Sequence, residues 1–218
     1  MRYLFLAVFI VSSVVHLYGS YINNSKIRAW SKGLILLGLL GWYCCCASAF
    51  SWIVVVAILA SWLGDMLLIP RGIKWFTAGG ISFMVSHFFF ALAYWPNIDF
   101  SRFPAWLAIS VGIIYFVIVC FVFRGLRPHL PHALFYPMFA YLLINGTMNC
   151  FAFYQLMSVT CEATIITFIG AVLFFTSDST LFYVRFKKDS VWKNHFLVML
   201  TYIIGEFMII QGIMMLSM

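Results

Sequence analysis

Ionisable side chains interrupt several of the long apolar runs in this sequence of 218 residues. Three acids, Asp65, Asp178 and Glu206, and one histidine, His87, lie inside such runs. A charged group at the centre of a membrane costs about 3 kcal/mol on insertion scales, so it usually marks a functional site. Carboxyl and imidazole groups are also common proton-transfer catalysts. These four residues are therefore candidates for acid–base chemistry; the alternative is that each is a hydrogen-bonded packing contact between helices.

Two of the acids are predicted to lie at the same depth. Asp65 precedes Arg71 by six residues, and Asp178 precedes Arg185 by seven. With the helical rise of about 1.5 Å per residue, each carboxyl lies about 10 Å inside the same edge of the membrane. We therefore expect Asp65 and Asp178 to face one pocket, although they are far apart in the sequence.

A second, deeper level of polar side chains is predicted from the same rise. His87, Asn145 and Glu206 each lie about 20 Å from that edge, and we expect them on the floor of the pocket. Tyr202 precedes Glu206 by one turn and is expected to hydrogen-bond it. For His87, a structural role and metal ligation remain alternatives. The basic residues that mark the edge for this level are Lys74, His132 and Lys193.

The composition is that of a membrane protein. Hydrophobic residues make up 65% of the chain and charged residues 9%, with a mean hydropathy of +1.04, whereas soluble domains carry roughly 25% charged residues. We predict an all-α integral membrane protein, a bundle of about eight transmembrane helices forming a single domain over residues 1–218, whose first run is retained rather than cleaved as a signal peptide. The predicted spans are 3–19, 32–49, 51–69, 74–94, 105–123, 133–153, 164–183 and 196–216.

The 13 lysines and arginines are distributed unevenly between the predicted loops. Only Arg2 and Arg102 lie on the side of the termini. The positive-inside rule therefore places the odd-numbered loops in the cytosol and both termini outside, and a bacterial inner membrane suits this compact form. Basic residues scattered over short loops do not suggest a nucleic-acid partner. The odd-numbered loops hold Lys26, Arg28, Lys32, Arg71, Lys74, Arg124, Arg127, Arg185, Lys187, Lys188 and Lys193.

The third and seventh runs have similar ends, which suggests an internal duplication. Each run places its acid, Asp65 or Asp178, shortly before a basic loop, and a helix with one ionisable group follows. The runs are four spans apart and have the same direction, as two parallel four-helix halves require. Coincidence is the alternative. Within the third run, Ala57, Ser61 and Asp65 recur every four residues, so they share one helix face.

Four short motifs resemble those of the YhhN-type lysoplasmalogenase family. They are SWLGD at 61–65, FMVSH at 83–87, GAVLFFTSD at 170–178 and TY at 201–202, in the family's order and spacing. The likeness covers nearly the whole chain. It implies an eight-span fold and hydrolysis of the vinyl-ether bond of lysoplasmalogens, which yields a fatty aldehyde and glycerophosphocholine or glycerophosphoethanolamine.

The resemblance also implies a set of site residues. The two motif aspartates of the family correspond to Asp65 and Asp178, and the motif histidine corresponds to His87. A vinyl ether is cleaved after protonation at carbon, so one carboxylic acid would donate the proton and an ionised partner would stabilise the cation and orient water. His87 would tune the pair or relay a proton. We expect substrate contacts from Lys32, Ser61, Arg71, Asn145, Ser177, Tyr202 and Glu206.

Partners and rival functions follow from the same residues. The expected partners are a lysophospholipid, entering from the cytosolic leaflet, and membrane lipids; no cofactor is expected. A metal-dependent, ceramidase-like amidase is one rival, but zinc wants about three ligands, and His16, His87 and His195 lie at scattered depths. A small-solute or proton-coupled transporter is a second rival, and a catalytically silent, lipid-binding relative is a third.

The six cysteines are interpreted mostly as small apolar residues, with palmitoylation or a Cys150–Cys161 bridge as alternatives.

Overall fold

The fold, seen in a computed structural model that describes residues 1–187 and 195–216, is all helical over these ranges. Eight α-helices account for most of the chain, and four short 3₁₀ segments join them. The helices are α1 (Arg2–Tyr21), α2 (Ser25–Cys46), α3 (Trp52–Leu67), α4 (Ile73–Tyr94), α5 (Ala105–Leu126), α6 (Phe135–Ser158), α7 (Glu162–Phe186) and α8 (His195–Leu216). The 3₁₀ segments are η1 (Trp95–Asn97), η2 (Phe100–Arg102), η3 (Arg127–His129) and η4 (His132–Leu134).

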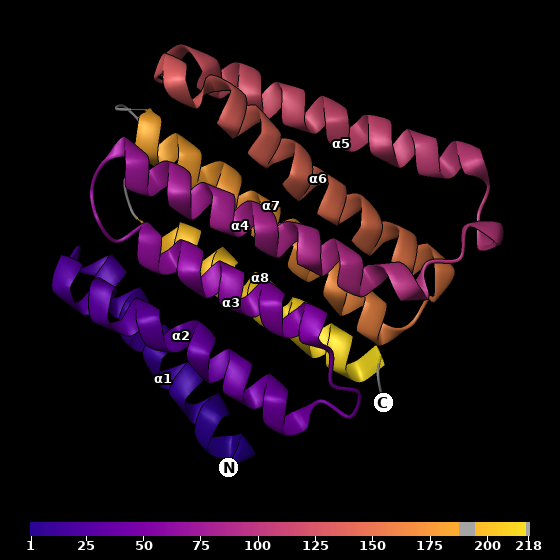
Figure 1. Ribbon diagram of the computed structural model, residues 1–218, viewed down its shortest axis with the longest axis horizontal. Helices are drawn as coiled ribbons and strands as arrows, with labels where there is room; N and C mark the ends of the chain where they lie inside the picture. Colours follow the sequence, from indigo (N-terminus) through magenta and orange to yellow (C-terminus); the bar gives the residue numbers. More distant parts are fainter. Residues whose placement is uncertain (188–194, 217–218) are drawn as a thin grey trace.

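Successive helices run up and down through one bundle (Figure 1). The sequential pairs α1–α2, α3–α4, α5–α6 and α7–α8 pack side by side, with α4 and α6 in contact across the middle. Both termini lie at one end of the bundle, and the loops after α1, α3 and α5 lie at the other (Figure 1). We call this second end the basic end; it comprises residues 22–28, 68–74, 124–134 and 185–187. The sequence predicts that the odd-numbered loops lie on one side, and the positions of the loops after α1, α3 and α5 agree with this. The assignment of that side to the cytosol stays a prediction.

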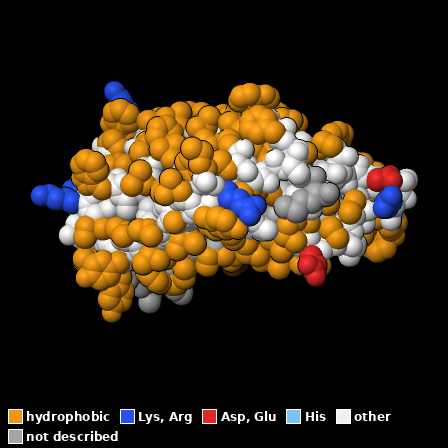
Figure 2. Space-filling model, turned by 90° about the horizontal axis from the view of Figure 1, so that it is seen from below, with side chains coloured by type: hydrophobic (Ala, Val, Ile, Leu, Met, Phe, Trp, Pro, Cys, Tyr) orange, Lys and Arg blue, Asp and Glu red, His pale blue; other side chains and the backbone are white. Residues whose placement is uncertain are grey.

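Six of the helices are long and apolar enough to cross a membrane: α1, α2, α4, α5, α7 and α8. The chain is therefore a multi-pass membrane protein. Its surface fits this conclusion, because hydrophobic side chains cover most of the face in Figure 2 and few charged ones appear there. Helix α5 lies at the edge of the bundle and exposes Trp106, Ile113 and Phe121, as expected of a lipid-facing helix.

Helices α3 and α6 differ from the other six, so the predicted count of eight spans stays a prediction. Helix α3 has 16 residues, a length of about 24 Å, which is shorter than the roughly 30 Å of a hydrocarbon core. Helix α6 has 24 residues but is less apolar, because Asn145, Asn149 and Gln155 are buried along it. These amides face the protein interior, where Asn145 donates to Asp178 and Asn149 donates to the Asn145 carbonyl oxygen.

Local sequence explains where several helices begin. Asn24 caps α2, since its side chain accepts hydrogen bonds from the backbone N–H groups of Lys26 and Ile27. Gly72, with φ of 129°, makes the turn that precedes α4, in a conformation that side chains rarely adopt. Thr164 and Cys161 form a reciprocal cap at the start of α7. These signals fix the loops at the helix ends and hence the register of the spans.

Glycine residues let particular helices approach closely. A Cβ atom on Gly79 of α4 would lie 3.1 Å from the Gly64 carbonyl oxygen of α3, and one on Gly170 of α7 would lie 2.8 Å from the Gly205 carbonyl oxygen of α8. Small residues have this role in many membrane helix pairs. Asp65 and Asp178 lie on the same helices, so these contacts hold the acidic helices against α4 and α8.

Contacts between helices partly match the predicted division into two halves. The pairs α1–α2, α3–α4, α2–α3 and α2–α8 correspond to α5–α6, α7–α8, α6–α7 and α6–α4, if each helix of the first half is matched to the helix four places later. The match is incomplete, because α1 also packs against α8 whereas α5 packs against α7. The two-half architecture remains a prediction that these contacts favour.

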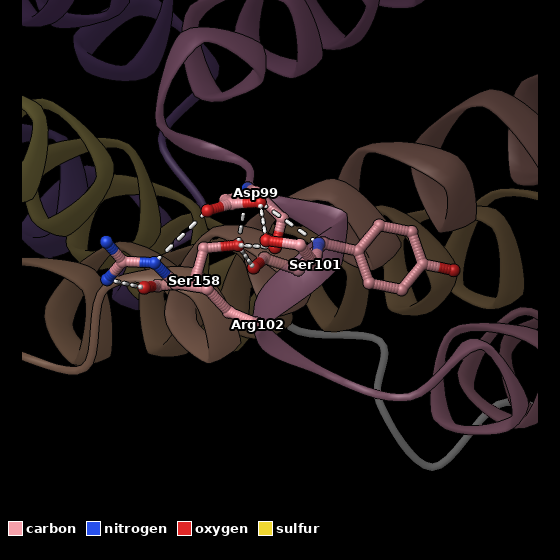
Figure 3. A network of polar contacts seen from close by, with 5 residues as sticks. Asp99, Ser101, Arg102 and Ser158 are labelled. Carbon is pink, nitrogen blue, oxygen red and sulfur yellow. Dashed lines mark hydrogen bonds and ion pairs between the residues drawn. The ribbon is translucent and has the colours of Figure 1, made fainter.

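A polar network fastens the loop between α4 and α5 at the end opposite the basic end (Figure 3). The Asp99 backbone N–H donates to the Ser158 hydroxyl at 2.8 Å, and Arg102 donates to the Ser158 carbonyl oxygen at 3.0 Å. The Asp99 carboxylate accepts from Ser101 and pairs with Arg102. The loop is thus tied to the last residue of α6.

Candidate functional site

A cavity of about 330 Å³ opens at the basic end. Side chains from α1, α2, α3, α7 and α8 line it, together with residues of the loop after α3 and two side chains of α4, Phe76 and Phe83. Its inner part contains Lys32, Asp65, Ser177, Asp178 and Tyr202. The residues around its mouth include His16, Arg28, Arg71, Arg185 and His195. Both predicted carboxyl groups therefore line one cavity.

A larger groove, of about 660 Å³, lies between α1 and α2 and is almost entirely apolar. Lys26 is the single charged residue that lines it, beside the exposed ring of Trp30. It offers space along a hydrophobic helix pair but no acid–base group. The smaller, polar cavity is the better candidate for chemistry.

Asp65 is buried and has partners on two other helices, α2 and α8. The Lys32 ammonium of α2 lies 3.0 Å from Asp65 Oδ1, and the Tyr202 hydroxyl of α8 donates to Asp65 Oδ2 at 2.9 Å. Trp62, one turn before the acid, donates its indole N–H to the Gly33 carbonyl oxygen at 2.9 Å. This bond fixes α2 beside α3 at the residue after Lys32. Both oxygens of the carboxylate are thus engaged, one of them by a cation.

Asp178 has neutral donors instead of a lysine. Its Oδ2 accepts hydrogen bonds from the Tyr141 hydroxyl at 2.5 Å and from the Asn145 amide at 2.8 Å, both on α6. His87 Nε2 of α4 lies 3.4 Å from the same oxygen. The hydroxyl of Ser177, one residue earlier, donates to the Val198 carbonyl oxygen and ties α7 to α8. All three groups that surround Asp178 therefore approach one oxygen, Oδ2.

The two acids have matching surroundings. Asp65 is contacted from α2 and α8, and Asp178 from α6 and α4, which are the helices that correspond under the predicted duplication. Lys32 precedes Asp65 by 33 residues, and Asn145 precedes Asp178 by the same number. Related positions thus carry a cation next to one acid and an amide next to the other. This difference makes the two carboxyl groups chemically unequal.

The predicted pairing of Tyr202 with Glu206 is wrong. The Tyr202 hydroxyl bonds Asp65, and neither Glu206 oxygen has a hydrogen-bond partner. Side chains on a helix point back toward its N-terminus, so the Tyr202 ring extends toward the basic end and away from Glu206. The sequence spacing placed both residues on one face but did not give this direction.

The predicted deeper level is only partly present. His87 and Asn145 reach Asp178, so the two levels merge there instead of lying about 10 Å apart. Glu206 is fully buried, does not line the cavity and is not part of its floor. The depth of Glu206 was counted from Lys193, which lies outside the described residues, as does Lys188. Counting along each helix neglects side-chain length and helix stagger, which together bring His87 and Asn145 to the acid.

Six of the ten predicted site residues line the cavity, and four do not. Of the four, His87 and Asn145 lie against Asp178, whereas Ser61 shares a hydrogen bond of 2.7 Å with Ser86 and joins α3 to α4. Glu206 is fully buried and does not line the cavity. The six that line it are Lys32, Asp65, Arg71, Ser177, Asp178 and Tyr202.

Sequence reasoning missed Tyr141 and did not single out Arg28. Tyr141 makes the shortest hydrogen bond to Asp178 and lies one turn before Asn145 on the same face of α6, a spacing that could have identified it. Arg28 lies one turn before Lys32 on α2 and lines the mouth. Both were passed over because tyrosine is common in membrane helices and because arginine next to a loop reads as a topology signal.

Neither a metal cluster nor a disulfide appears in the described part of the chain. No group of three or more His, Cys, Asp or Glu residues there is arranged to hold a metal ion. The six cysteines are free thiols, so the alternative of a Cys150–Cys161 bridge is not realised in this structure.

Comparison with known proteins gives one match. The sequence profile of the YhhN family matches residues 27–213, which include every residue that contacts the two acids. No curated protein and no solved structure matches the chain.

Proposed function

Because the chain belongs to the YhhN family, we propose that it is a lysoplasmalogenase, which cleaves the vinyl-ether bond of a lysophospholipid within the membrane. Family membership is consistent with this activity. The observation that carries the proposal is that Asp65 and Asp178, from helices distant in the sequence, line one cavity with different partners. Two carboxyl groups in different settings are the arrangement that separates an acid from a base.

The contacts suggest which carboxyl has which role. Asp65 is the ionised carboxylate in this proposal, because the Lys32 ammonium at 3.0 Å compensates its charge. Hydrogen-bond donors contact both acids and do not distinguish them. Asp178 has no lysine or arginine among its described partners; two neutral donors occupy its Oδ2. Oδ1 is then the atom that carries a proton and donates it. Asp178 is thus the general acid, and Asp65 is the carboxylate that stabilises positive charge.

The reaction follows from these roles. Asp178 transfers its proton to the vinyl carbon remote from the ether oxygen, which leaves an oxocarbenium ion. The Asp65 carboxylate stabilises this cation and accepts a proton from the water that adds to it. Asp65 returns this proton to the glycerol oxygen as the carbon–oxygen bond of the hemiacetal breaks, and Asp178 accepts the proton of the hemiacetal hydroxyl, which gives a fatty aldehyde and the free glycerol hydroxyl. One water is consumed, and both carboxyl groups return to their starting states after proton exchange.

His87 is a positioning residue in this scheme. Its Nε2 lies 3.4 Å from Asp178 Oδ2, and it is fully buried and does not line the cavity. It therefore acts on Asp178 and not on the substrate.

The test is turnover of two matched lipids by the purified protein. A lysoplasmalogen is incubated with the protein, in parallel with the saturated ether of the same chain and headgroup, and released aldehyde is measured. We expect aldehyde from the vinyl ether alone. Asp65→Asn and Asp178→Asn should each lower the rate by at least about a hundredfold, the usual contribution of acid–base catalysis.

The controls distinguish this function from its rivals. Glu162→Gln changes an acid at the start of α7, in the first turn and outside the cavity lining, and should keep the wild-type rate. Full turnover in a folded Asp65→Asn or Asp178→Asn protein would remove that residue from the mechanism. Solute flux through vesicles without any aldehyde release would favour a transporter instead.

A further inference from the structure

The mouth of the cavity carries positive charge that no carboxylate pairs with among residues 1–187 and 195–216. Arg28 of α2, Arg71 after α3 and Arg185 of α7 all line it, so folding gathers three guanidinium groups from separate elements. None of the three lies in an ion pair with a carboxylate among the residues that the structure describes. Arg185 stands over the Phe76 ring at 5.8 Å. We call these three residues the arginine mouth.

The acids inside the cavity do not neutralise the arginine mouth. Asp178 precedes Arg185 by seven residues on α7, and Asp65 lies on α3 before the loop that holds Arg71; among the described residues neither acid forms an ion pair with an arginine of the mouth. Asp65 is already paired with Lys32. A ligand therefore meets a cationic opening first and a pair of carboxyl groups only at depth. Its anionic group belongs at the opening, and its reacting bond belongs inside.

We propose that the arginine mouth selects single-chain lipids whose headgroup is net negative, such as a phosphomonoester or a phosphoglycerol, over zwitterionic headgroups. The inference rests on the proposed function, because it names the headgroup of the lipid that the same cavity would cleave. Arginine binds phosphate through paired, charge-assisted hydrogen bonds. A choline or ethanolamine cation would extend from that phosphate among the same guanidinium groups, which repel it.

Described residues of the mouth supply no carboxylate to receive an ammonium group, and the acids that line the cavity are Asp65 and Asp178 in its inner part. The cavity is small, because its volume of about 330 Å³ is near the lower limit of roughly 300 Å³ for ligand cavities. Charge at the mouth is therefore the feature that distinguishes headgroups.

Binding of lipids that cannot be cleaved tests this selectivity without any turnover. Saturated 1-O-alkyl lysolipids with phosphate, phosphoglycerol or phosphocholine headgroups and one common chain are titrated into the full-length protein in nonionic detergent. The shift of its thermal unfolding midpoint gives each affinity. We expect the two anionic lipids to bind about tenfold more tightly than the phosphocholine lipid. This preference should shrink at high salt, where exposed charges are screened.

Arginine variants locate the selectivity. Arg28→Gln and Arg185→Gln should each reduce the anionic preference, and the double variant, which keeps only Arg71 of the three, should reduce it further. Arg124→Gln is the matched control, because Arg124 is an arginine at the same end of the bundle that does not line the cavity. Should the double variant not fold, the wild-type headgroup comparison and its salt dependence still decide. Equal affinities for all three headgroups, or an intact preference in the folded double variant, would overturn the proposal.

Two further arms separate the possible sources of phosphate and the two proposals. Inorganic phosphate and glycerol 3-phosphate should shift the unfolding midpoint far less than the lysolipids; equal shifts would make the mouth a site for soluble phosphate and overturn the lipid assignment. Vinyl-ether cleavage without headgroup preference would overturn the arginine mouth and leave the proposed function standing. Headgroup preference without cleavage would overturn the proposed function and leave the mouth as a lipid-binding site.

Discussion

At the scale of single residues, Asp65 and Asp178 differ in their partners: a lysine lies beside Asp65, whereas neutral donors contact Asp178. Both acids were identified from the sequence, because a carboxyl group inside an apolar run is rare and costly. Their common cavity was expected from equal depth along parallel helices. The partners were expected only in part, because Tyr202 was predicted to bond Glu206 instead and Tyr141 was missed. Side-chain direction, which sequence spacing leaves open, decided that Tyr202 reaches Asp65.

Lys32 and the buried Asp65 form an ion pair in which each charge compensates the other. Removing one partner of such a pair leaves an uncompensated charge, which costs about 3 kcal/mol or more. We predict that Lys32→Gln destabilises the protein by about this amount, as measured by thermal unfolding in detergent. The double variant Lys32→Gln/Asp65→Asn should recover most of the lost stability but not the activity.

A result in which the double variant is no more stable than Lys32→Gln would show that the lysine acts through packing and not through the acid. Lys26→Gln serves as the control. It alters a lysine on the same helix that has no carboxylate within 4 Å among the described residues, and its effect should be close to zero.

At the scale of elements, the apolar runs predicted all eight helices, and the boundaries differ by a few residues. The largest differences are at the helix ends. Only three residues separate the end of α1 at Tyr21 from the start of α2 at Ser25, and α6 continues to Ser158. The cap at Asn24 extends α2 beyond its apolar part, which begins later. The 3₁₀ segments η3 and η4 delay the start of α6 to Phe135. Hydropathy marks the part of a helix within lipid and not the turns that cap it.

The contact between α7 and α8 depends on glycine. A Cβ on Gly170 would lie 2.8 Å from both the Gly205 carbonyl oxygen and the Ile209 nitrogen, which are backbone atoms that cannot rotate away. We predict that Gly170→Ala separates the two helices and costs about 1–3 kcal/mol, the usual effect of overpacking. Thermal unfolding in detergent measures this loss.

Gly112→Ala is the matched control for this prediction. The nearest atom to its Cβ is the Tyr154 hydroxyl oxygen at 3.8 Å, an ordinary contact. Alanine favours a helix over glycine by up to about 1 kcal/mol, so this variant should be neutral or slightly more stable. Equal effects of the two substitutions would contradict the close packing of α7 and α8.

The loop between α4 and α5 has a pH dependence that follows from Asp99. Hydrogen bonds from the Ser101 hydroxyl and backbone N–H, with a smaller contribution from Arg102, hold the pKa of Asp99 below its usual value. The stabilisation is therefore complete above the unfolded pKa of about 4 and is lost as the pH falls through the lower folded pKa. We expect the loop to become more sensitive to an acid-active protease below that range.

Asp99→Asn gives the comparison for this loop. The variant lacks the titrating group, so its protease sensitivity should not change with pH in the way the wild type does, and the two proteins should converge at the acid end. A wild-type profile that is flat from neutral to acid pH would show that the carboxylate does not hold the loop.

At the scale of the whole molecule, composition and charge predicted more than they could for a soluble fold. A chain with few charges must be a bundle in lipid, and alternating loops must then lie at opposite ends. The number of spans could not be settled in the same way, because α3 is short and α6 is polar. Both helices carry or contact the two acids, so the features that weaken them as membrane spans are those that serve the cavity.

The shortness of α3 has a consequence for the bilayer around it. A helix of 16 residues falls several ångströms short of the hydrocarbon thickness, and such a mismatch is relieved by thinning of the lipid or by entry of water. Its C-terminal end, where Asp65 lies two residues before the last, borders the mouth of the cavity. The bulk aqueous phase thereby approaches a carboxyl group that a longer helix would place deep in the hydrocarbon, and the proposed hydrolysis would obtain its water without a separate channel.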